Sequence, residues 1–241
     1  MKTMTNKTSR NDIRDLDELV RRSVKEGVSK VVGETMSESY VAEPKQFKQV
    51  TEFVSQKTKD SHISLYKKYV ETLNEVSAEL DTADRTETSS SHSMFRSCKL
   101  DEAYNLNAVW LHELYFSNCF DPHSEIVMDS LAYLSLQKSW GTFDDWQRDF
   151  MACAFSAGNG WAVCGYNLYL KNFVNAFVSN HSQDVMMGFY PVIVVDMWEH
   201  AYAKDYGTDK KSYLISQMKE INWAVVEERV KKAKAMEIAL K

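Results

Sequence analysis

The sequence predicts an α+β fold: an N-terminal long helical hairpin and a C-terminal α/β domain with a small three-stranded antiparallel sheet. The chain has 241 residues but only three prolines and eight glycines, so long helices are expected to run uninterrupted. Three short β-rich runs separated by turns occur late in the chain, after helical segments, as in an α+β domain. They cover residues 161–166, 173–178 and 190–195.

Composition places the chain among ordinary globular proteins, with 44% hydrophobic and 26% charged residues. The net charge of −5 argues against a nucleic-acid or anionic-membrane binder. No apolar run reaches the length of a membrane span, and residues 1–14 lack the apolar core of a secretory signal. The four cysteines have no C-x-x-C spacing, so we expect reduced thiols in a cytoplasmic or other reducing compartment.

Residues 1–50 are expected to form an N-terminal extension with one amphipathic helix over residues 13–36. Its apolar residues recur at intervals of three and four, as on one face of a helix. They are Ile13, Leu16, Leu19, Val20, Val24, Val28, Val31 and Val32. Two interpretations stay open: a packing-only extension, or a surface that docks onto a partner or a larger assembly.

The helical hairpin is expected within residues 51–125. Ser55 has the residue type of a helix N-cap, and apolar residues then follow with helical spacing up to Val76. The Ser/Thr-rich segment 82–93 predicts a loop. A second long helix is predicted over residues 99–118, ending before Asp121-Pro122.

The C-terminal domain is expected to cover residues 126–241. Helices are predicted over residues 126–138 and 143–156, the second capped by Thr142. Further helices are predicted after the third strand, over residues 198–206, 211–220 and 222–238.

Three of the six histidines lie inside helical apolar stretches: His62, His112 and His200. A single histidine in such a stretch is usually a packed residue. Asp196 makes a metal site the better interpretation for His200, because Asp196 directly follows the buried strand run Val192–Val195. A carboxylate there is costly unless it is paired or bound to a metal. Asp196 and His200, four residues apart, can converge on one point across a strand-to-helix turn.

These residues also carry a family resemblance. The run from Asp196 to Tyr202 resembles the D-x-W-E-H-A-Y signature of iron/manganese superoxide dismutases. Other segments are similar to further motifs of the family: residues 55–62, 69–74, 107–122, 140–143, 158–161, 213–214 and 222–223. The resemblance covers residues 52–232 and places His62 and His112 at the first two ligand positions.

The resemblance implies a superoxide dismutase with one manganese or iron ion held by His62, His112, Asp196 and His200. Three imidazoles and one carboxylate suit these metals better than thiolates would. In the family, one superoxide ion reduces the trivalent metal and leaves as dioxygen. A second superoxide ion reoxidises the metal and leaves as peroxide, taking up two protons.

The resemblance also assigns neighbours of the metal. Tyr69 and Gln183 are expected catalytic residues, Gln183 being the glutamine that touches metal-bound solvent in manganese-type members. The iron-type glutamine position is the small Ala108, so a manganese-type arrangement is favoured. Trp161 and Trp198 would wall the site. Glu199 would bridge to His200 of a second subunit in a homodimer.

The chain departs from the family pattern around the entrance to the site. His62 precedes Tyr69 by seven residues instead of the family's eight, which either removes a helical bulge or misplaces His62. The family's gateway histidine is Leu65 here, although counting from His62 gives Tyr66, and its tyrosine partner is Ala203. An alternative is therefore a catalytically impaired structural subunit of a ribosomal or viral particle.

Overall fold

The computed structural model describes residues 41–239, and the predicted helix over residues 13–36 lies outside them. From Ala42 onward the chain forms one compact unit. Both the predicted hairpin domain and the predicted C-terminal domain lie within this unit. Among the described residues, no helix combines the length and the apolar character that crossing a membrane requires.

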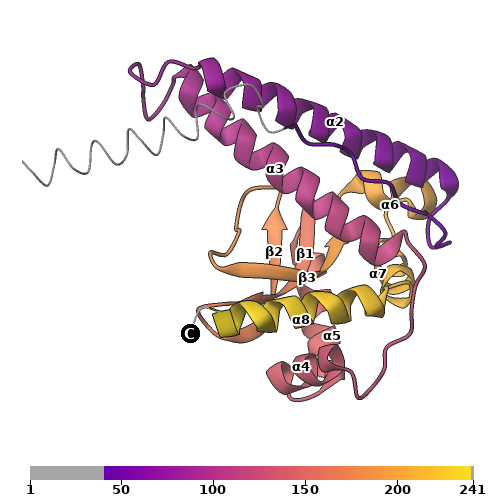
Figure 1. Cartoon of the computed structure of the whole chain (residues 1–241). Helices are drawn as coiled ribbons and strands as arrows, with labels where there is room; N and C mark the ends of the chain where they lie inside the picture. Colours follow the sequence, from indigo (N-terminus) through magenta and orange to yellow (C-terminus); the bar gives the residue numbers. More distant parts are fainter. Residues whose placement is uncertain (1–40, 240–241) are drawn as a thin grey trace, which may run out of the picture. The chain divides into compact units, whose positions relative to one another are not determined.

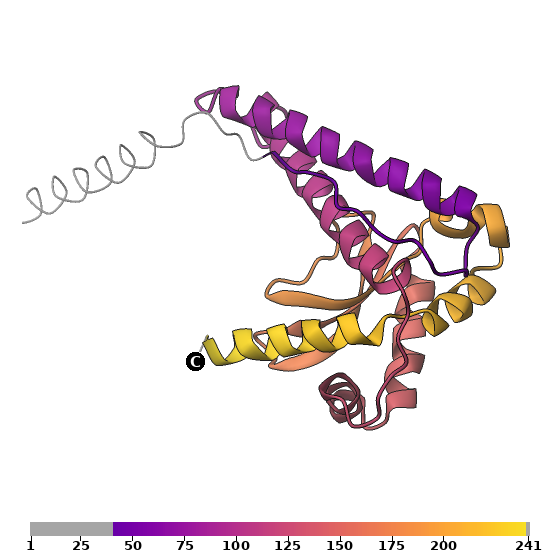
Figure 2. The ribbon, with the colours of Figure 1, turned by 45° about the vertical axis from the view of Figure 1, so that its right-hand side comes forward.

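Two long helices form the predicted hairpin (Figure 1): α2 (Gln56–Thr82) and α3 (Met94–Cys119). Ser55 caps α2, because its hydroxyl accepts a hydrogen bond from the backbone N–H of Thr58. Helix α3 begins five residues earlier than predicted, because Ser93 caps it by accepting from the N–H of Arg96. The two helices pack against each other; they lie alongside in Figure 1 and diverge from their connecting loop in the turned view of Figure 2.

The remaining helices follow the predicted order: α4 (Leu131–Trp140), α5 (Phe143–Ser156), α6 (Glu199–Tyr206), α7 (Lys210–Lys219) and α8 (Trp223–Ala239). Thr142 caps α5 as expected, by accepting from the N–H of Asp145. Helix α4 begins later than the predicted residue 126, because Ser130 is the residue that caps it. The α+β fold class is confirmed.

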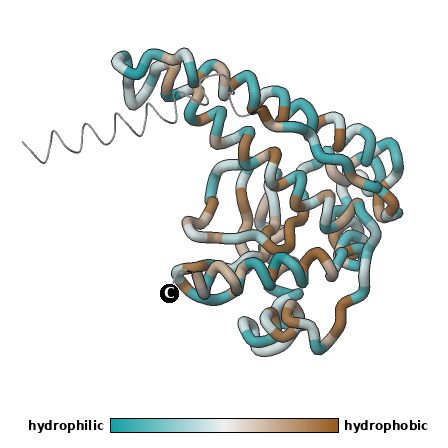
Figure 3. The backbone as a smooth tube through the Cα atoms, viewed as in Figure 1, coloured by the Kyte–Doolittle hydropathy of each residue, from teal (hydrophilic) through white to brown (hydrophobic). Residues whose placement is uncertain are grey.

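The sheet has three antiparallel strands in the order β2-β1-β3. They are β1 (Gly160–Asn167), β2 (Asn172–Ser179) and β3 (Phe189–Asp196). Every residue of the central strand β1 is buried. Helix α5 packs on β1 and β2, whereas α3 and α8 pack along β3. Helix α2 mixes hydrophilic and hydrophobic colours along its length (Figure 3), as expected for an amphipathic helix.

Two local contacts hold the end of β3, where Asp196 lies. The carbonyl oxygen of Gly160 accepts a hydrogen bond of 2.9 Å from the N–H of Met197. The Tyr213 hydroxyl donates a hydrogen bond of 2.8 Å to the carbonyl oxygen of Asp196. The backbone on both sides of this carboxylate is therefore fixed by other elements.

An irregular segment, residues 42–54, crosses the helical hairpin; we call it the strap. At its start, the backbone of Ala42 exchanges two hydrogen bonds with the Asn74 side chain, at 2.7 and 3.0 Å. Further along, the buried Lys59 ammonium donates to the carbonyl oxygens of Gln49 and Thr51. The strap is thus tied to α2 at two levels.

Candidate metal centre

Four side chains from four elements meet at one point inside the molecule. His62 comes from α2, His112 from α3, Asp196 from the end of β3 and His200 from α6. One potential ligand atom from each lies within 4.8 Å of the others. His62, His112 and Asp196 are buried, and the side chain of His200 is 27% exposed. The structure thus brings together the whole predicted ligand set.

The orientation of His112 is fixed by its own helix. Its Nδ1 lies 2.6 Å from the carbonyl oxygen of Ala108, one turn earlier in α3. A carbonyl oxygen can only accept, so Nδ1 carries the proton and Nε2 has a free lone pair. Nε2 is buried and has no hydrogen-bond partner. A buried polar atom without a partner is costly, and a metal ion would satisfy it.

One carboxylate oxygen of Asp196 faces the cluster, and the other accepts a backbone hydrogen bond. Its Oδ2 lies 3.1 Å from Nε2 of His62 and 3.2 Å from Nε2 of His200. Its Oδ1 accepts a hydrogen bond of 2.8 Å from the N–H of Trp198. This division fixes the carboxylate and leaves Oδ2 facing two imidazoles, as a one-oxygen metal ligand requires.

The shortened spacing in α2 does not displace His62. Helix α2 is a continuous α-helix from Gln56 to Thr82, and both His62 and Tyr69 reach the site from it. Residues seven apart lie almost on one helical face. The ring centroids of His62 and His112 are 5.1 Å apart. Of the two alternatives for this departure, the structure shows an unbulged helix that still delivers the histidine.

The protonation of the cluster suits a cation. Burial lowers the pKa of His62 and lowers that of His112 further, so both imidazoles stay neutral at pH 7. For Asp196, burial alone would raise the pKa, but the contacts with His200 and His62 outweigh it and hold the pKa well below its usual range. Neutral imidazoles and an ionised carboxylate are the forms that bind metal.

The cluster has the size and donor chemistry of a mononuclear site. At typical metal–ligand distances near 2.1 Å, two donors on opposite sides of an ion lie about 4.2 Å apart. The observed limit of 4.8 Å fits that span with small adjustments. Three nitrogens and one carboxylate oxygen are a donor set that manganese and iron accept.

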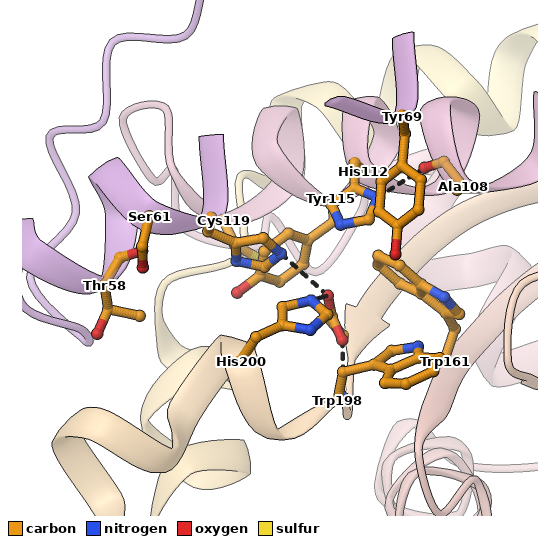
Figure 4. A network of polar contacts seen from close by, with 12 residues as sticks. Thr58, Ser61, Tyr69, Ala108, His112, Tyr115, Cys119, Trp161, Trp198 and His200 are labelled. Carbon is orange, nitrogen blue, oxygen red and sulfur yellow. Dashed lines mark hydrogen bonds and ion pairs between the residues drawn. The ribbon is translucent and has the colours of Figure 1, made fainter. Parts of the chain in front are cut away.

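Aromatic side chains wall the cluster. Figure 4 shows Tyr69, Trp161 and Trp198 grouped beside the imidazoles of His112 and His200. Trp161 lies edge-on to His112, with ring centroids 4.8 Å apart, and Trp198 stacks on His200 at 5.8 Å. Aromatic rings therefore flank two of the four candidate ligands.

Comparison with known proteins identifies the family. The family description "Iron/manganese superoxide dismutases, C-terminal domain" matches residues 130–229. Two proteins named "Superoxide dismutase [Fe]", from Aquifex aeolicus (strain VF5) and Aquifex pyrophilus, are 33% identical over 179 residues, covering 73% of this chain and 83% of theirs. The chain belongs to the iron/manganese superoxide dismutase family.

Relatives with the other metal in their names are also similar. "Superoxide dismutase [Mn] 1" of Halobacterium salinarum is 28% identical over 172 residues, covering 71% of this chain and 84% of its own. Superoxide dismutases named for iron and for manganese thus both align with the chain.

The structure places Gln183 on the connection between β2 and β3. This residue is exposed, and its Oε1 accepts a hydrogen bond of 3.3 Å from the Asn180 side chain. The position between Tyr69 and Trp161 is taken by His181, which is buried. Gln183 follows β2 by four residues and His181 by two, and the turn of the chain directs only His181 inward. Sequence analysis missed His181; its place just after a strand with a buried face was the available signal.

Both ring nitrogens of His181 are engaged. Trp161 Nε1–H donates to Nδ1 at 2.9 Å, so Nδ1 is the acceptor. Burial lowers the pKa of His181 to about 4, so the ring is neutral and its proton lies on Nε2. Nε2 is 3.0 Å from the Tyr69 hydroxyl oxygen and donates to it. The Tyr69 hydroxyl can then donate its own proton to a group other than His181.

The remaining predicted residues lie at the edge of the site. Glu199 is exposed in the first turn of α6, next to His200. Leu65 is half-buried in α2 and Ala203 is exposed in α6. The family's gateway pair therefore has no hydrogen-bonding side chain at either position.

Proposed function

We propose that this chain is a superoxide dismutase that holds one manganese or iron ion through His62, His112, Asp196 and His200. The observation that carries the proposal is the convergence of these four donors on one buried point, with Nε2 of His112 unpartnered. Neutral imidazoles with a single carboxylate leave a bound divalent or trivalent ion with a net positive charge. Such a site attracts the superoxide anion.

A bound ion would supply the one-electron change between its trivalent and divalent states, which converts one superoxide to dioxygen and another to peroxide. The chain supplies orientation and protons. Tyr69 accepts a hydrogen bond from His181, which leaves its own hydroxyl proton to donate to another group. We assign Tyr69 as the donor nearest the substrate and His181 as the residue that orients it. Trp161 and Trp198 exclude water.

The choice between manganese and iron does not follow from the ligands. The expectation of a manganese-type arrangement rested on Gln183, whose side chain is exposed and hydrogen-bonds to Asn180. We also infer a homodimer in which the exposed Glu199 contacts His200 of the partner subunit.

The intact ligand set favours the enzyme over a structural subunit of a larger particle, because a purely structural role does not need a buried, unpartnered imidazole nitrogen.

Elemental analysis and an activity assay test the proposal together. The purified chain, loaded with manganese or iron, should contain about one ion per chain and remove superoxide. His112→Ala should lose both properties, because it deletes the donor with the free lone pair. His123→Ala is the matched control, since His123 is exposed and lies beside Glu220, outside the cluster. A wild-type chain that takes up neither metal contradicts the proposal.

His181→Leu tests the assignment of the neighbouring histidine. The substitution leaves the Trp161 N–H and the Tyr69 hydroxyl without their partner, so we expect at least about a tenfold loss of kcat, as for other residues that orient metal-site groups. The matched control is Gln183→Leu, which should keep kcat within about twofold. Steady-state kinetics with equal metal content measures both. Equal losses in the two variants would refute the assignment to His181.

A further inference from the structure

A hydrogen-bonded bridge joins α2 to α3 beside the candidate ligands. The Tyr66 hydroxyl donates to Oε1 of Glu113 at 2.9 Å. Tyr66 follows His62 by one helical turn, and Glu113 directly follows His112. The ring of Tyr66 lies 6.3 Å from that of His112. The bridge therefore connects the two helices at the level where each presents its histidine.

The strap also contacts both residues of the bridge. The backbone N–H of Lys45 donates to the Tyr66 hydroxyl oxygen at 2.9 Å, and the Lys45 ammonium pairs with Oε2 of Glu113. The ring of Phe47 packs against Tyr66 and Phe116. Tyr66 is fully buried, and the Glu113 side chain is only 13% exposed. Both carboxylate oxygens and the phenol oxygen thus have defined partners.

The proton of the bridge stays on the phenol. Burial raises the pKa of Tyr66 well above its usual value, and the neighbouring Glu113 carboxylate raises it further. With its pKa raised, Tyr66 keeps its proton at neutral pH and is the donor of the bridge. A hydrogen bond to a carboxylate is directional, so the bridge links α2 and α3 at a defined separation.

We propose that Tyr66 and Glu113 are positioning residues for the metal centre, which set the separation of α2 and α3 at which His62 and His112 face the same ion. The proposal rests on the proposed metal-binding function and adds two residues to it. Neither side chain touches the cluster with a polar atom, so both act through the histidines. Metal affinity depends on such supporting contacts because ligands must be held close to their final geometry.

The test compares Tyr66→Phe with Tyr166→Phe. Both variants keep a buried ring and lose one phenol–carboxylate hydrogen bond, since the Tyr166 hydroxyl donates to Glu237 at 2.5 Å between β1 and α8. We expect Tyr66→Phe to weaken Mn²⁺ affinity about tenfold, measured by chelator competition. It should also change the visible absorption of bound Co²⁺. Tyr166→Phe should change Mn²⁺ affinity less than about twofold and leave the Co²⁺ spectrum unchanged.

Two Glu113 variants test whether the hydrogen bond itself, rather than the carboxylate charge, sustains Mn²⁺ affinity. Glu113→Gln keeps a carbonyl oxygen that accepts from Tyr66, so its Mn²⁺ affinity should stay within about threefold of wild type, whereas Glu113→Leu should match Tyr66→Phe. Equal Mn²⁺ affinities and Co²⁺ spectra in Tyr66→Phe and Tyr166→Phe would overturn the proposal and leave the bridge a purely structural contact.

A metal-free measurement separates this inference from the proposed function. Imidazole NMR signals of the metal-free chain should shift for His62 and His112 in Tyr66→Phe and stay in place in Tyr166→Phe. If wild type bound no metal, the proposed function would fail, while shifted signals would still support positioning. Unshifted signals in Tyr66→Phe would overturn the inference even if wild type were an active enzyme.

Discussion

Asp196→Ala is expected to abolish metal retention and superoxide removal together. The substitution removes the carboxylate ligand whose Oδ2 faces both His62 and His200. Loss of residues that merely support a metal ligand typically costs 10- to 100-fold in affinity, so loss of this ligand should weaken Mn²⁺ binding by more than about 100-fold. Chelator competition measures the affinity, and a superoxide assay measures the activity.

The same substitution should lower the melting temperature of the metal-loaded protein. Metal that binds only the native state adds its binding free energy to folding stability. The control is Asp149→Ala, because Asp149 lies on α5 and accepts hydrogen bonds from Trp140 and Asn175 instead of facing the cluster. An Asp196→Ala protein that melts at the wild-type temperature and still retains one ion would contradict the assigned ligand set.

Gly160→Ala is expected to destabilise the fold severely although it adds one methyl group. A Cβ at this position would lie 2.2 Å from the carbonyl oxygen of Val178 and 2.9 Å from that of Ala157. Both are backbone atoms of packed elements and cannot rotate away. Overpacking of this kind commonly costs 1–3 kcal/mol, and we expect about 3 kcal/mol here, measured by denaturant unfolding of the metal-free chain.

The matched control for Gly160→Ala is Gly188→Ala. Gly188 has a positive φ of 65°, but an added Cβ there meets only the Leu168 side chain at 3.9 Å. Left-handed backbone costs an ordinary residue about 1–2 kcal/mol, so this variant should be the milder one. Because Gly160 also binds the N–H of Met197, beside Asp196, Gly160→Ala should weaken Mn²⁺ binding too. A Gly160→Ala protein as stable as Gly188→Ala would refute the steric argument.

The parts of this molecule that sequence could predict are those set by local chemistry. Ser55 and Thr142 have the side chains that cap helices, and both do so. Apolar runs bounded by turns predicted all three strands within a residue or so of their observed ends. The four metal-ligand candidates followed from the run around Asp196 and the family resemblance that it carries.

The parts that sequence could not predict depend on contacts between distant segments. His181 faces the cluster and Gln183 faces solvent because of how the connection from β2 to β3 turns, with positive φ angles at Asn180 and Asp184. No local pattern encodes that direction. The bridge between Tyr66 and Glu113 likewise joins residues on separate helices, and neither residue type alone signals a partner.

The distribution of the four candidate ligands over the chain has a consequence for biosynthesis. A nascent chain that has completed only the α2–α3 hairpin holds two imidazoles together, but it lacks the carboxylate and the third imidazole, which come from the end of β3 and from α6. Two neutral nitrogens bind a hard divalent ion weakly. The full donor set for manganese or iron therefore exists only once the end of β3 and α6 have joined the hairpin.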